Sequence, residues 1–286
     1  MIRKLSMYSQ KWNIGIDLCQ ASIQLVATKQ NRKRRYLCEC WQHNIPNEIT
    51  SQSEHDRYEM LLKILIQWRR KLPKNCQVSM AFSALRTLKQ QVTLPEQVTL
   101  KQPELGWYLQ SCAEKLFPLS SEDLVIDYRV IDNRAYLNGV RKSEIVFWQN
   151  LLHDSGFLLT AIDVAPCVLR YIARYAGLPD ESWLIHYRQG EWLWTGPVSQ
   201  PATYNQIQEN DITTLPQIIA LLNENNGPLK LPLYYIGDHH KSQAVHSWSL
   251  LQAFHNHTVR LPHQLGDFVV ATGLALRDKD RDHVSS

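Results

Sequence analysis

The stretch Ile14 to Val26, IGIDLCQASIQLV, has the pattern of two strands joined by a tight turn. Apolar residues recur at every second position on either side of the turn, which is typical of a half-buried β-hairpin. Such a hairpin binds nucleotide phosphates when small residues let its backbone N–H groups reach the phosphate oxygens. Cys19 and Gln20 stand in this turn. The segment therefore has the outline of a phosphate-binding hairpin, with side chains that oppose this use.

Strand and helix patterns alternate along the rest of the chain. The opening part has the order β-β-β-α-β, and a shortened form of this order begins at Trp183 with a hairpin around Gln189 and Gly190. We therefore predict two related α/β lobes with a nucleotide-sized cleft between them. The expected strands are 12–17, 21–28, 34–42, 77–82, 88–94, 124–130, 134–140, 157–164, 183–187, 191–195 and 233–236. The expected helices are 58–68, 103–116, 144–154, 164–175, 215–222, 248–254 and 267–276.

These patterns divide the chain into five parts. Residues 1–83 form the first half of lobe I, and residues 84–141 form a small inserted α+β subdomain. Residues 142–180 return to lobe I, and residues 181–276 form lobe II with a closing helix. We expect residues 277–286 to be a mobile tail.

The composition indicates a folded globular protein. The chain has 286 residues, of which 44% are hydrophobic, and 31 Lys and Arg against 27 Asp and Glu leave a net charge of +4. This charge is too small to mark the whole chain as a nucleic-acid binder. The basic N-terminus lacks the apolar stretch of a secretory signal, and the apolar segment 268–276 is too short to span a bilayer. We expect a cytosolic protein without a transmembrane anchor.

Three small groups of metal-ligand residue types occur, and each lacks a second ligand pair at metal-site spacing. They are Cys38 with Cys40, Asp238-His239-His240, and His255 with His257. We expect no metal site, with Asp238 as a helix N-cap and the two later histidines on a surface strand. No CxxC pair occurs, which favours reduced thiols at the six cysteines, Cys19, Cys38, Cys40, Cys76, Cys112 and Cys167.

A dense basic run, KQNRKRR, covers residues 29–35 and falls between two expected strands. It is expected at an exposed hairpin tip. Three interpretations stay open for it: a solvated turn, attraction to an anionic membrane leaflet, and contact with DNA phosphates. The third predicts salt-sensitive DNA binding that depends on residues 32–35.

Five segments carry a family resemblance through their order and spacing. They are IGIDLCQASIQLV, VSMAFSALRTLKQQVTLP, SSEDLVIDYRV, GFLLTAIDVAPCVLRYIAR and GDFVVATGLALR. In these segments the chain resembles the PilM proteins of type IV pilus and competence systems, which are related to FtsA, and among them the enterobacterial DNA utilization branch. The resemblance implies an actin-like (ribonuclease H-like, duplicated) two-lobe α/β fold with an inserted small α+β subdomain.

The resemblance also implies a function. The protein would be a cytosolic adaptor, peripheral at the inner face of the inner membrane, in a platform that assembles a pilus-like fibre or supports DNA uptake or utilization. Its partner would be the cytosolic N-terminal tail of a PilN-like bitopic membrane protein, without direct DNA contact. The inserted subdomain would contribute to the partner surface, where the neighbouring aromatic residues Trp107 and Tyr108 are candidate anchors. Core packing of the pair is the alternative.

Active members of the family bind ATP in the cleft, and four positions here match their nucleotide motifs. Asp17 would contact Mg²⁺ through water. The matching residues are Gly15, Asp17, Ser22 and Gly237. In the first turn, however, Cys19, Gln20 and Ala21 replace a Gly and two Ser, and Gln24 replaces a Lys.

The second hairpin departs further from the family pattern. His186 stands in place of an Asp, and Arg188 stands where a small residue is expected, so its side chain would fill the phosphate site. We therefore expect no ATP or Mg²⁺ cofactor and no catalysis. The alternative, an active actin-like ATPase, would need a carboxylate such as Asp163 or Asp267 to activate water. GxxxxGK[ST], GxGxxG, GxSxG and HExxH motifs are absent from the sequence.

Overall fold

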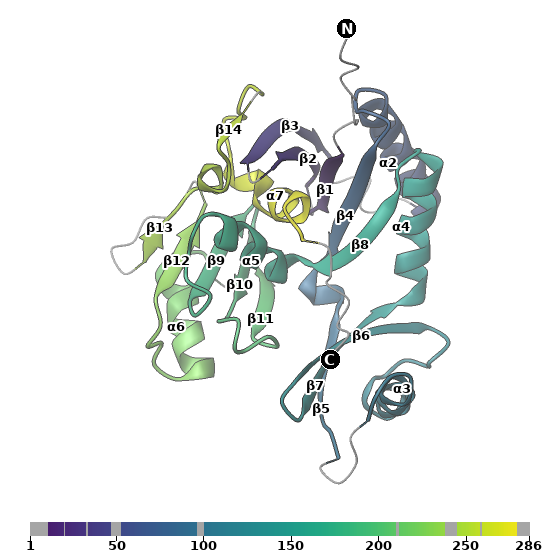
Figure 1. The fold of residues 1–286 in the computed structure, drawn as a ribbon, viewed down its shortest axis with the longest axis vertical. Coiled ribbons are helices and arrows are strands. Elements are labelled where there is room, and N and C mark those ends of the chain that lie inside the picture. Colours follow the sequence, from purple (N-terminus) through teal and green to yellow (C-terminus); the bar gives the residue numbers. More distant parts are fainter. Residues whose placement is uncertain are drawn as a thin grey trace, which may run out of the picture.

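Three β-sheets and the helices between them organise the chain (Figure 1). The computed structural model describes residues 11–19, 21–32, 34–46, 53–95, 100–209, 212–237, 245–257 and 259–278. Within these ranges, no helix is long and apolar enough to cross a membrane. Two of the sheets form two large lobes, and the third belongs to a smaller subdomain beside lobe I.

The sheet of lobe I contains the opening hairpin. Its first two strands pair in antiparallel register, with Ile14 opposite Ala27 and Asp17 opposite Gln24. The first, fourth and eighth strands of the chain run parallel to one another. The spatial order is β14 (Asn256–His257), β3 (Arg34–Asn44), β2 (Ser22–Asn31), β1 (Trp12–Leu18), β4 (Cys76–Phe82) and β8 (Leu159–Val164).

The sheet of lobe II repeats this arrangement. Two antiparallel pairings join its first three strands, and parallel pairings add the fourth and fifth. Apart from β14, both sheets have the spatial order third, second, first, fourth and fifth strand, so the predicted duplication is confirmed. The order in lobe II is β11 (Tyr204–Gln208), β10 (Glu191–Thr195), β9 (Trp183–Arg188), β12 (Leu233–Ile236) and β13 (His246–Ser247).

A separate three-stranded sheet builds the inserted subdomain. All of its strands and its helix come from one continuous stretch of chain after β4. Leu109 and Ala113 of that helix share a small core with Phe117 and Leu137. The elements are β5 (Leu88–Thr93), α3 (Glu104–Leu116), β6 (Leu124–Ile131) and β7 (Arg134–Arg141).

The helices complete a layered arrangement (Figure 1). α2 (Glu54–Arg69) and α4 (Lys142–Asp154) cover the outer face of the lobe I sheet, where Leu61 and Trp148 join the same core as Ile14. α5 (Ala165–Tyr175) and α7 (Val269–Ala275) lie between the two lobes.

α6 (Leu215–Asn226) covers lobe II. Two of the helices have side-chain caps at their N-termini. Ser53 caps α2, and Thr214 with Gln217 forms a capping box at α6.

Two glycines allow the central helices to pack closely. A Cβ at Gly15 of β1 would lie less than 3.0 Å from backbone atoms of Ala271 and Ala275 in α7. A Cβ at Gly273 of α7 would approach Val168 of α5 equally closely. Gly15 therefore brings α7 against β1, a packing role that the phosphate interpretation of the opening hairpin did not anticipate.

Some predicted elements need correction. The expected helix over 248–254 is wrong, because only a 3₁₀ turn forms at Leu250–Ala253, where the Ser249 hydroxyl accepts the N–H of Leu251. The closing helix is shorter than predicted and follows a separate 3₁₀ turn at Gly266–Phe268. The short strands β11 and β13 were not predicted, since so few residues show little periodicity. The surface strand expected at His257 is present as β14.

Candidate functional site

The turns of the two lobes meet directly in the cleft between them. The β9–β10 turn has Gln189 and Gly190 in left-handed backbone conformations, with φ of 41° and 81°. The Gln189 side chain reaches the opposite turn, where its Oε1 accepts hydrogen bonds from Cys19 Sγ at 2.9 Å and Ser22 Oγ at 2.7 Å. Side chains of this protein therefore lie between the two turns that would grip a nucleotide phosphate.

A buried ion pair joins the lobes beside this contact. Arg188 of β9 donates to Oδ2 of Asp17 on β1, and the two residues are only 3% and 1% exposed. Arg188 Nε also lies 3.5 Å from Oε2 of Glu191 on β10. The buried guanidinium is thus matched by two carboxylates, an arrangement that offsets part of its desolvation cost.

A hydrogen-bond network extends from Ser22 along the lobe I side of the cleft. Its Oγ lies 2.5 Å from Nε2 of Gln24 and 3.3 Å from Nε2 of Gln42. Gln42 Nε2 also lies 3.5 Å from Oδ2 of Asp267, which is buried. Asp267 is therefore engaged with an amide of the sheet, and Ser22 with the amides around it.

This set of side chains does not fit Mg²⁺ and ATP. A buried guanidinium against Asp17 brings positive charge to the carboxylate that would face the metal through water. Gln189 meets the N-terminal turn at the place where a phosphate would meet its backbone N–H groups. We therefore derive no chemical step through a nucleotide at this cleft.

Burial shifts the ionisation of two groups here. It raises the pKa of the Cys19 thiol above its ordinary value, although hydrogen bonds from Ser22 and Gln24 partly oppose the shift. A thiol with a raised pKa is a poor nucleophile at neutral pH. Burial also lowers the pKa of Arg188, and Glu191 opposes this shift. Because the ordinary pKa of arginine is so high, Arg188 stays charged at neutral pH.

Two residues of the predicted nucleotide motifs lie elsewhere in lobe II. Gly237 follows β12, and a Cβ there would meet the ring of Tyr235 at 2.8 Å and the carbonyl oxygen of Tyr187 at 3.4 Å. His186 is fully buried, with its Nδ1 2.8 Å from the carbonyl oxygen of Ile236. The structure thus brings Asp17 and Ser22 together in the cleft, whereas Gly15 packs on α7 and Gly237 beside Tyr235.

The other carboxylate considered for activating water is held by neighbours. Asp163 Oδ2 accepts a 2.7 Å hydrogen bond from the Tyr171 hydroxyl and lies 3.2 Å from Nε of Arg277. Burial and this carboxylate raise the pKa of Tyr171. Asp163 therefore joins β8, α5 and the end of the closing helix.

A second hollow opens next to the cleft, toward the inserted subdomain. It has a volume of about 560 Å³ and lies between the end of β4, α2, α4 and lobe II. Gln206 of β11 fixes one wall, since its Oε1 accepts hydrogen bonds from Ser83 Oγ at 3.0 Å and from the N–H of Ala84 at 3.1 Å. Its apolar lining includes Ile45, Met60, Phe82 and Trp148.

A further hollow of about 420 Å³ continues this path over the inserted subdomain. The two hollows share Leu85, Arg86 and Glu144, and Arg86 pairs with Glu144 at 2.9 Å. Leu85 is 52% exposed although it is a large apolar residue. We call the combined feature the subdomain groove, and its far end is lined by Leu88, Pro118, Leu119 and Arg141.

The two predicted anchor residues differ in how much of each side chain is exposed. Trp107 on α3 is 67% exposed, whereas Tyr108 packs against the core of the subdomain. Neither lines the subdomain groove. Their part in partner binding stays a prediction, with Trp107 the accessible member of the pair.

The predicted metal-ligand residues are only partly described. Over the described ranges, no group of three or more His, Cys, Asp or Glu side chains gathers closely enough to hold a metal ion. His257 lies in the two-residue strand β14 and is exposed. The segment 238–240 lies outside the described residues.

Several residues of the cleft and groove were not found by reading the sequence. Gln189 was recognised only as part of a hairpin turn, and nothing in the local pattern indicated that its amide reaches the other lobe. Arg86 and Glu144 are 58 positions apart, so no short motif joins them. The sequence of β11, YNQIQ, shows no regular alternation of apolar and polar residues, so it gave no signal for Gln206.

Comparison with known proteins adds family and fold information. The sequence pattern of the family described as type IV pilus assembly protein PilM matches residues 15–147. The DNA utilization protein HofM of Escherichia coli (strain K12) is 25% identical over 268 residues, which cover 93% of this chain and 96% of HofM.

Two solved structures share the fold. A chain of the PilM-PilN type IV pilus biogenesis complex superposes with a TM-score of 0.67 at 13% identity, covering 92% of this chain and 97% of that one. The cytoplasmic domain of EpsL, an inner membrane component of the type II secretion system of Vibrio cholerae, superposes with a TM-score of 0.58 at 15% identity. It covers 94% of this chain and 96% of that domain.

Proposed function

We propose that this chain, which has the predicted actin-like fold and is similar to PilM proteins, is a non-catalytic adaptor in a type IV pilus-like or competence-like assembly platform. It binds the cytosolic N-terminal tail of a PilN-like bitopic protein of the inner membrane. It is cytoplasmic and held at the inner face of that membrane by the tail. In this position it supports DNA uptake or utilization.

The direct contact between the two turns carries the proposal. Gln189 bonds to Cys19 and Ser22, and Arg188 pairs with Asp17, so the protein's own side chains supply the contacts that phosphate would make. Opening the cleft for a nucleotide would break a buried ion pair. Removing one partner of such a pair typically costs about 3–5 kcal/mol. A cleft closed in this way favours a scaffolding function over ATPase activity.

The subdomain groove supports peptide binding. Short peptides bind where an apolar channel is combined with a few polar groups that orient the backbone. The groove offers Phe82, Leu85 and Trp148 for apolar side chains, and the Arg86–Glu144 pair for polar contacts. The exposed Leu85 at the centre of the groove would be covered by the bound tail.

The relatives support the choice of partner. One structure with this fold belongs to a PilM-PilN type IV pilus biogenesis complex, and HofM is described as a DNA utilization protein. These similarities support a PilN-like partner and a role in type IV pilus assembly. The tail as the bound segment, the inner-membrane position and the absence of direct DNA contact belong to our proposal.

The test is calorimetric titration of a tail peptide into the full chain. The peptide is the cytosolic N-terminal tail of a PilN-like protein from the same organism. Leu85→Asp places a charge in the groove and should weaken binding by about tenfold or more, which corresponds to about 1.4 kcal/mol. Leu158→Asp is the matched control, because Leu158 is 62% exposed and does not line the groove. Equal affinities of the two variants would disprove the groove as the tail site.

A second titration addresses the cleft. We expect no binding of ATP with Mg²⁺ by the native chain. We also expect none by the double variant Cys19→Gly, Gln24→Lys, because Arg188 and Gln189 remain in place. Micromolar affinity of the native chain would overturn the closed cleft and favour the actin-like ATPase alternative. Binding only by the double variant would attribute the loss of ATP binding to the first turn alone.

A further inference from the structure

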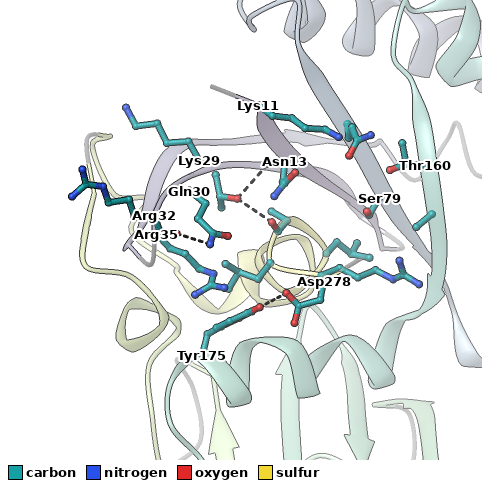
Figure 2. A pocket seen from close by; sticks show the side chains of 17 residues that line it. Lys11, Asn13, Lys29, Gln30, Arg32, Arg35, Ser79, Thr160, Tyr175 and Asp278 are labelled. Carbon is teal, nitrogen blue, oxygen red and sulfur yellow. Dashed lines mark hydrogen bonds between the residues drawn. The ribbon is translucent and has the colours of Figure 1, made fainter. Parts of the chain in front are cut away.

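A large pocket opens at the end of the lobe I sheet opposite the cleft (Figure 2). Its volume is about 700 Å³. The beginnings of the parallel strands β1, β4 and β8 form one side, with Asn13, Ser79 and Thr160, and the ends of α5 and α7 close another side. Asp17 lies at the opposite end of β1. The pocket is therefore separate from the cleft, and it shares no lining residue with the subdomain groove.

Positive charge is concentrated in this pocket. Five cationic side chains and one carboxylate line it. Without these six residues, the chain has 26 Lys and Arg against 26 Asp and Glu, so the lining accounts for the entire net charge of +4. The cations are Lys11, Lys29, Arg32, Arg35 and Arg277. Three of them, Lys29, Arg32 and Arg35, belong to the basic run whose role the sequence left open.

The carboxylate does not neutralise the cluster. Asp278 accepts a hydrogen bond from the Tyr175 hydroxyl and lies 3.6 Å from Arg174, which does not line the pocket. Arg277 is engaged by Asp163, outside the pocket lining. The remaining positive charge of the lining comes from Lys29 of β2, Arg32 of the following turn, Arg35 of β3, and Lys11.

Arg35 is held in a position suited to an anion. Its guanidinium stacks 3.4 Å above the ring of Tyr175, which occupies one face of the group. Stacking leaves the N–H edges of a guanidinium directed outward, where they can donate two parallel hydrogen bonds to a phosphate. Figure 2 shows Arg35 and Tyr175 opposite the wall that carries Ser79 and Thr160. Asn13 and Ser79 add neutral polar groups on that side.

We propose that this pocket binds a compact phosphate-bearing anion, either a free phosphate ester or the headgroup of an anionic phospholipid. Its volume lies in the range of small-molecule sites, roughly 300–1,000 Å³. Arginine in a concave site favours the planar, multidentate recognition of phosphate. Five cationic side chains around one hollow, with a single carboxylate in its lining, repel one another, so a polyanion would relieve part of that repulsion.

The probe is inorganic tripolyphosphate, titrated into the full chain without Mg²⁺. Arg34 and Arg35 are neighbours in β3, but only Arg35 lines the pocket, whereas Arg34 lines a separate hollow on the hairpin. Arg35→Gln and Arg34→Gln therefore change the total charge equally. We expect about a tenfold or greater loss of affinity for Arg35→Gln and less than about a twofold loss for Arg34→Gln. Equal losses would show unspecific surface charge and overturn the proposal.

A second pair of variants tests the site independently, in case Arg35→Gln unfolds the protein. Thr160 is exposed and lines the pocket. Thr160→Glu adds a negative charge to the wall, and Thr160→Gln adds nearly the same volume without charge. We expect the Glu variant to bind tripolyphosphate about tenfold more weakly than the Gln variant. Equal affinity of the two would contradict a site in this pocket.

Co-sedimentation with vesicles distinguishes the two sources of phosphate. Binding to phosphatidylcholine vesicles that contain phosphatidylglycerol, but not to pure phosphatidylcholine, assigns the site to lipid headgroups if Arg35→Gln abolishes it and Arg34→Gln does not. Tripolyphosphate binding without vesicle binding assigns it to a free phosphate ester. Binding of neither probe overturns the proposal. So does tighter binding of a polyglutamate peptide or of double-stranded DNA than of tripolyphosphate.

Discussion

At the carboxyl end of β1, Arg188 lies buried between Asp17 and Glu191, whereas at its amino end Arg35 and its cationic neighbours face an open hollow. The first end has the position of a ligand site in an α/β fold, and the second does not. Yet the first has its charges paired inside the protein, and the second has five cationic side chains against one carboxylate in its lining. An excess of positive charge favours an anionic ligand, so position in the fold is the weaker guide to binding here.

Breaking the buried pair gives the largest expected effect. Arg188→Ala leaves Asp17 and Glu191 buried without their cation, and we expect the free energy of unfolding to fall by about 3–5 kcal/mol. Arg86→Ala is the matched control, because its pair with Glu144 is exposed and should contribute no more than about 1 kcal/mol. Urea denaturation measures both. Similar losses would mean that the interlobe pair contributes no more than a surface pair.

The packing of β1 against α7 lies between the two ends and gives the next largest effect. Gly15→Ala forces a methyl group into the backbone of α7, and we expect a loss of about 1–3 kcal/mol or more. Gly106→Ala in α3 meets no atom closer than 3.5 Å and should stabilise the protein by about 0.5–1 kcal/mol. Thermal unfolding of both variants checks the opposite signs. An unchanged thermal stability of Gly15→Ala would show that α7 can move away from β1 at little cost.

Thiol labelling tests whether the cleft end stays closed. Gln189→Ala removes the acceptor shared by Cys19 and Ser22, and each lost hydrogen bond typically costs about 1 kcal/mol. We expect Cys19 to be alkylated about tenfold faster in this variant, as the local opening becomes easier. Cys76, also buried, is the internal control in the same sample. Mass spectrometry follows both thiols, and an unchanged rate at Cys19 would show that Gln189 does not hold the turns together.

The smallest expected effect concerns the pKa values of two tyrosines, one in the pocket and one near the cleft. Burial, with hydrogen bonds to Asp278 and Glu209, raises the pKa of both Tyr175 in the pocket and Tyr187 near the cleft to about 12. The unfolded chain ionises near pH 10, so stability falls as the pH rises from about 10 to about 12. In Tyr175→Phe, the free energy of unfolding should fall less over this pH range, which urea denaturation measures.

Phosphate binding should change the pKa of one tyrosine but not that of the other. Tripolyphosphate in the pocket would disfavour a second negative charge there and raise the pKa of Tyr175 further, without effect on Tyr187. Absorbance titration of the Tyr175→Phe and Tyr187→Phe variants resolves the two groups. A shift at Tyr187 would place the anion at the cleft instead.

Much of the fold followed from local patterns. The opening hairpin, the long helix α2 and the inserted β6–β7 pair are continuous in sequence, and their periodicity is visible within one window. The short strands β11 and β13 and the 3₁₀ turn at Leu250–Ala253 were missed, because their conformation depends on neighbours from other parts of the chain. The same limit applies to sites. The size of Arg188 suggested that it fills the cleft, but the sequence did not indicate its partner, Asp17, 171 positions away.

The sequence by itself indicated the resemblance to PilM proteins, the duplicated lobes and the absence of the small residues that phosphate-binding turns require. Tertiary structure alone decided how charge is distributed over the lobe I sheet. It placed Gln189 between the turns, joined Arg86 to Glu144 in the groove, and gathered Lys11, Arg35 and Arg277 around one hollow. The reason is that electrostatic interaction depends on distance and burial, which folding sets between residues that the chain keeps far apart.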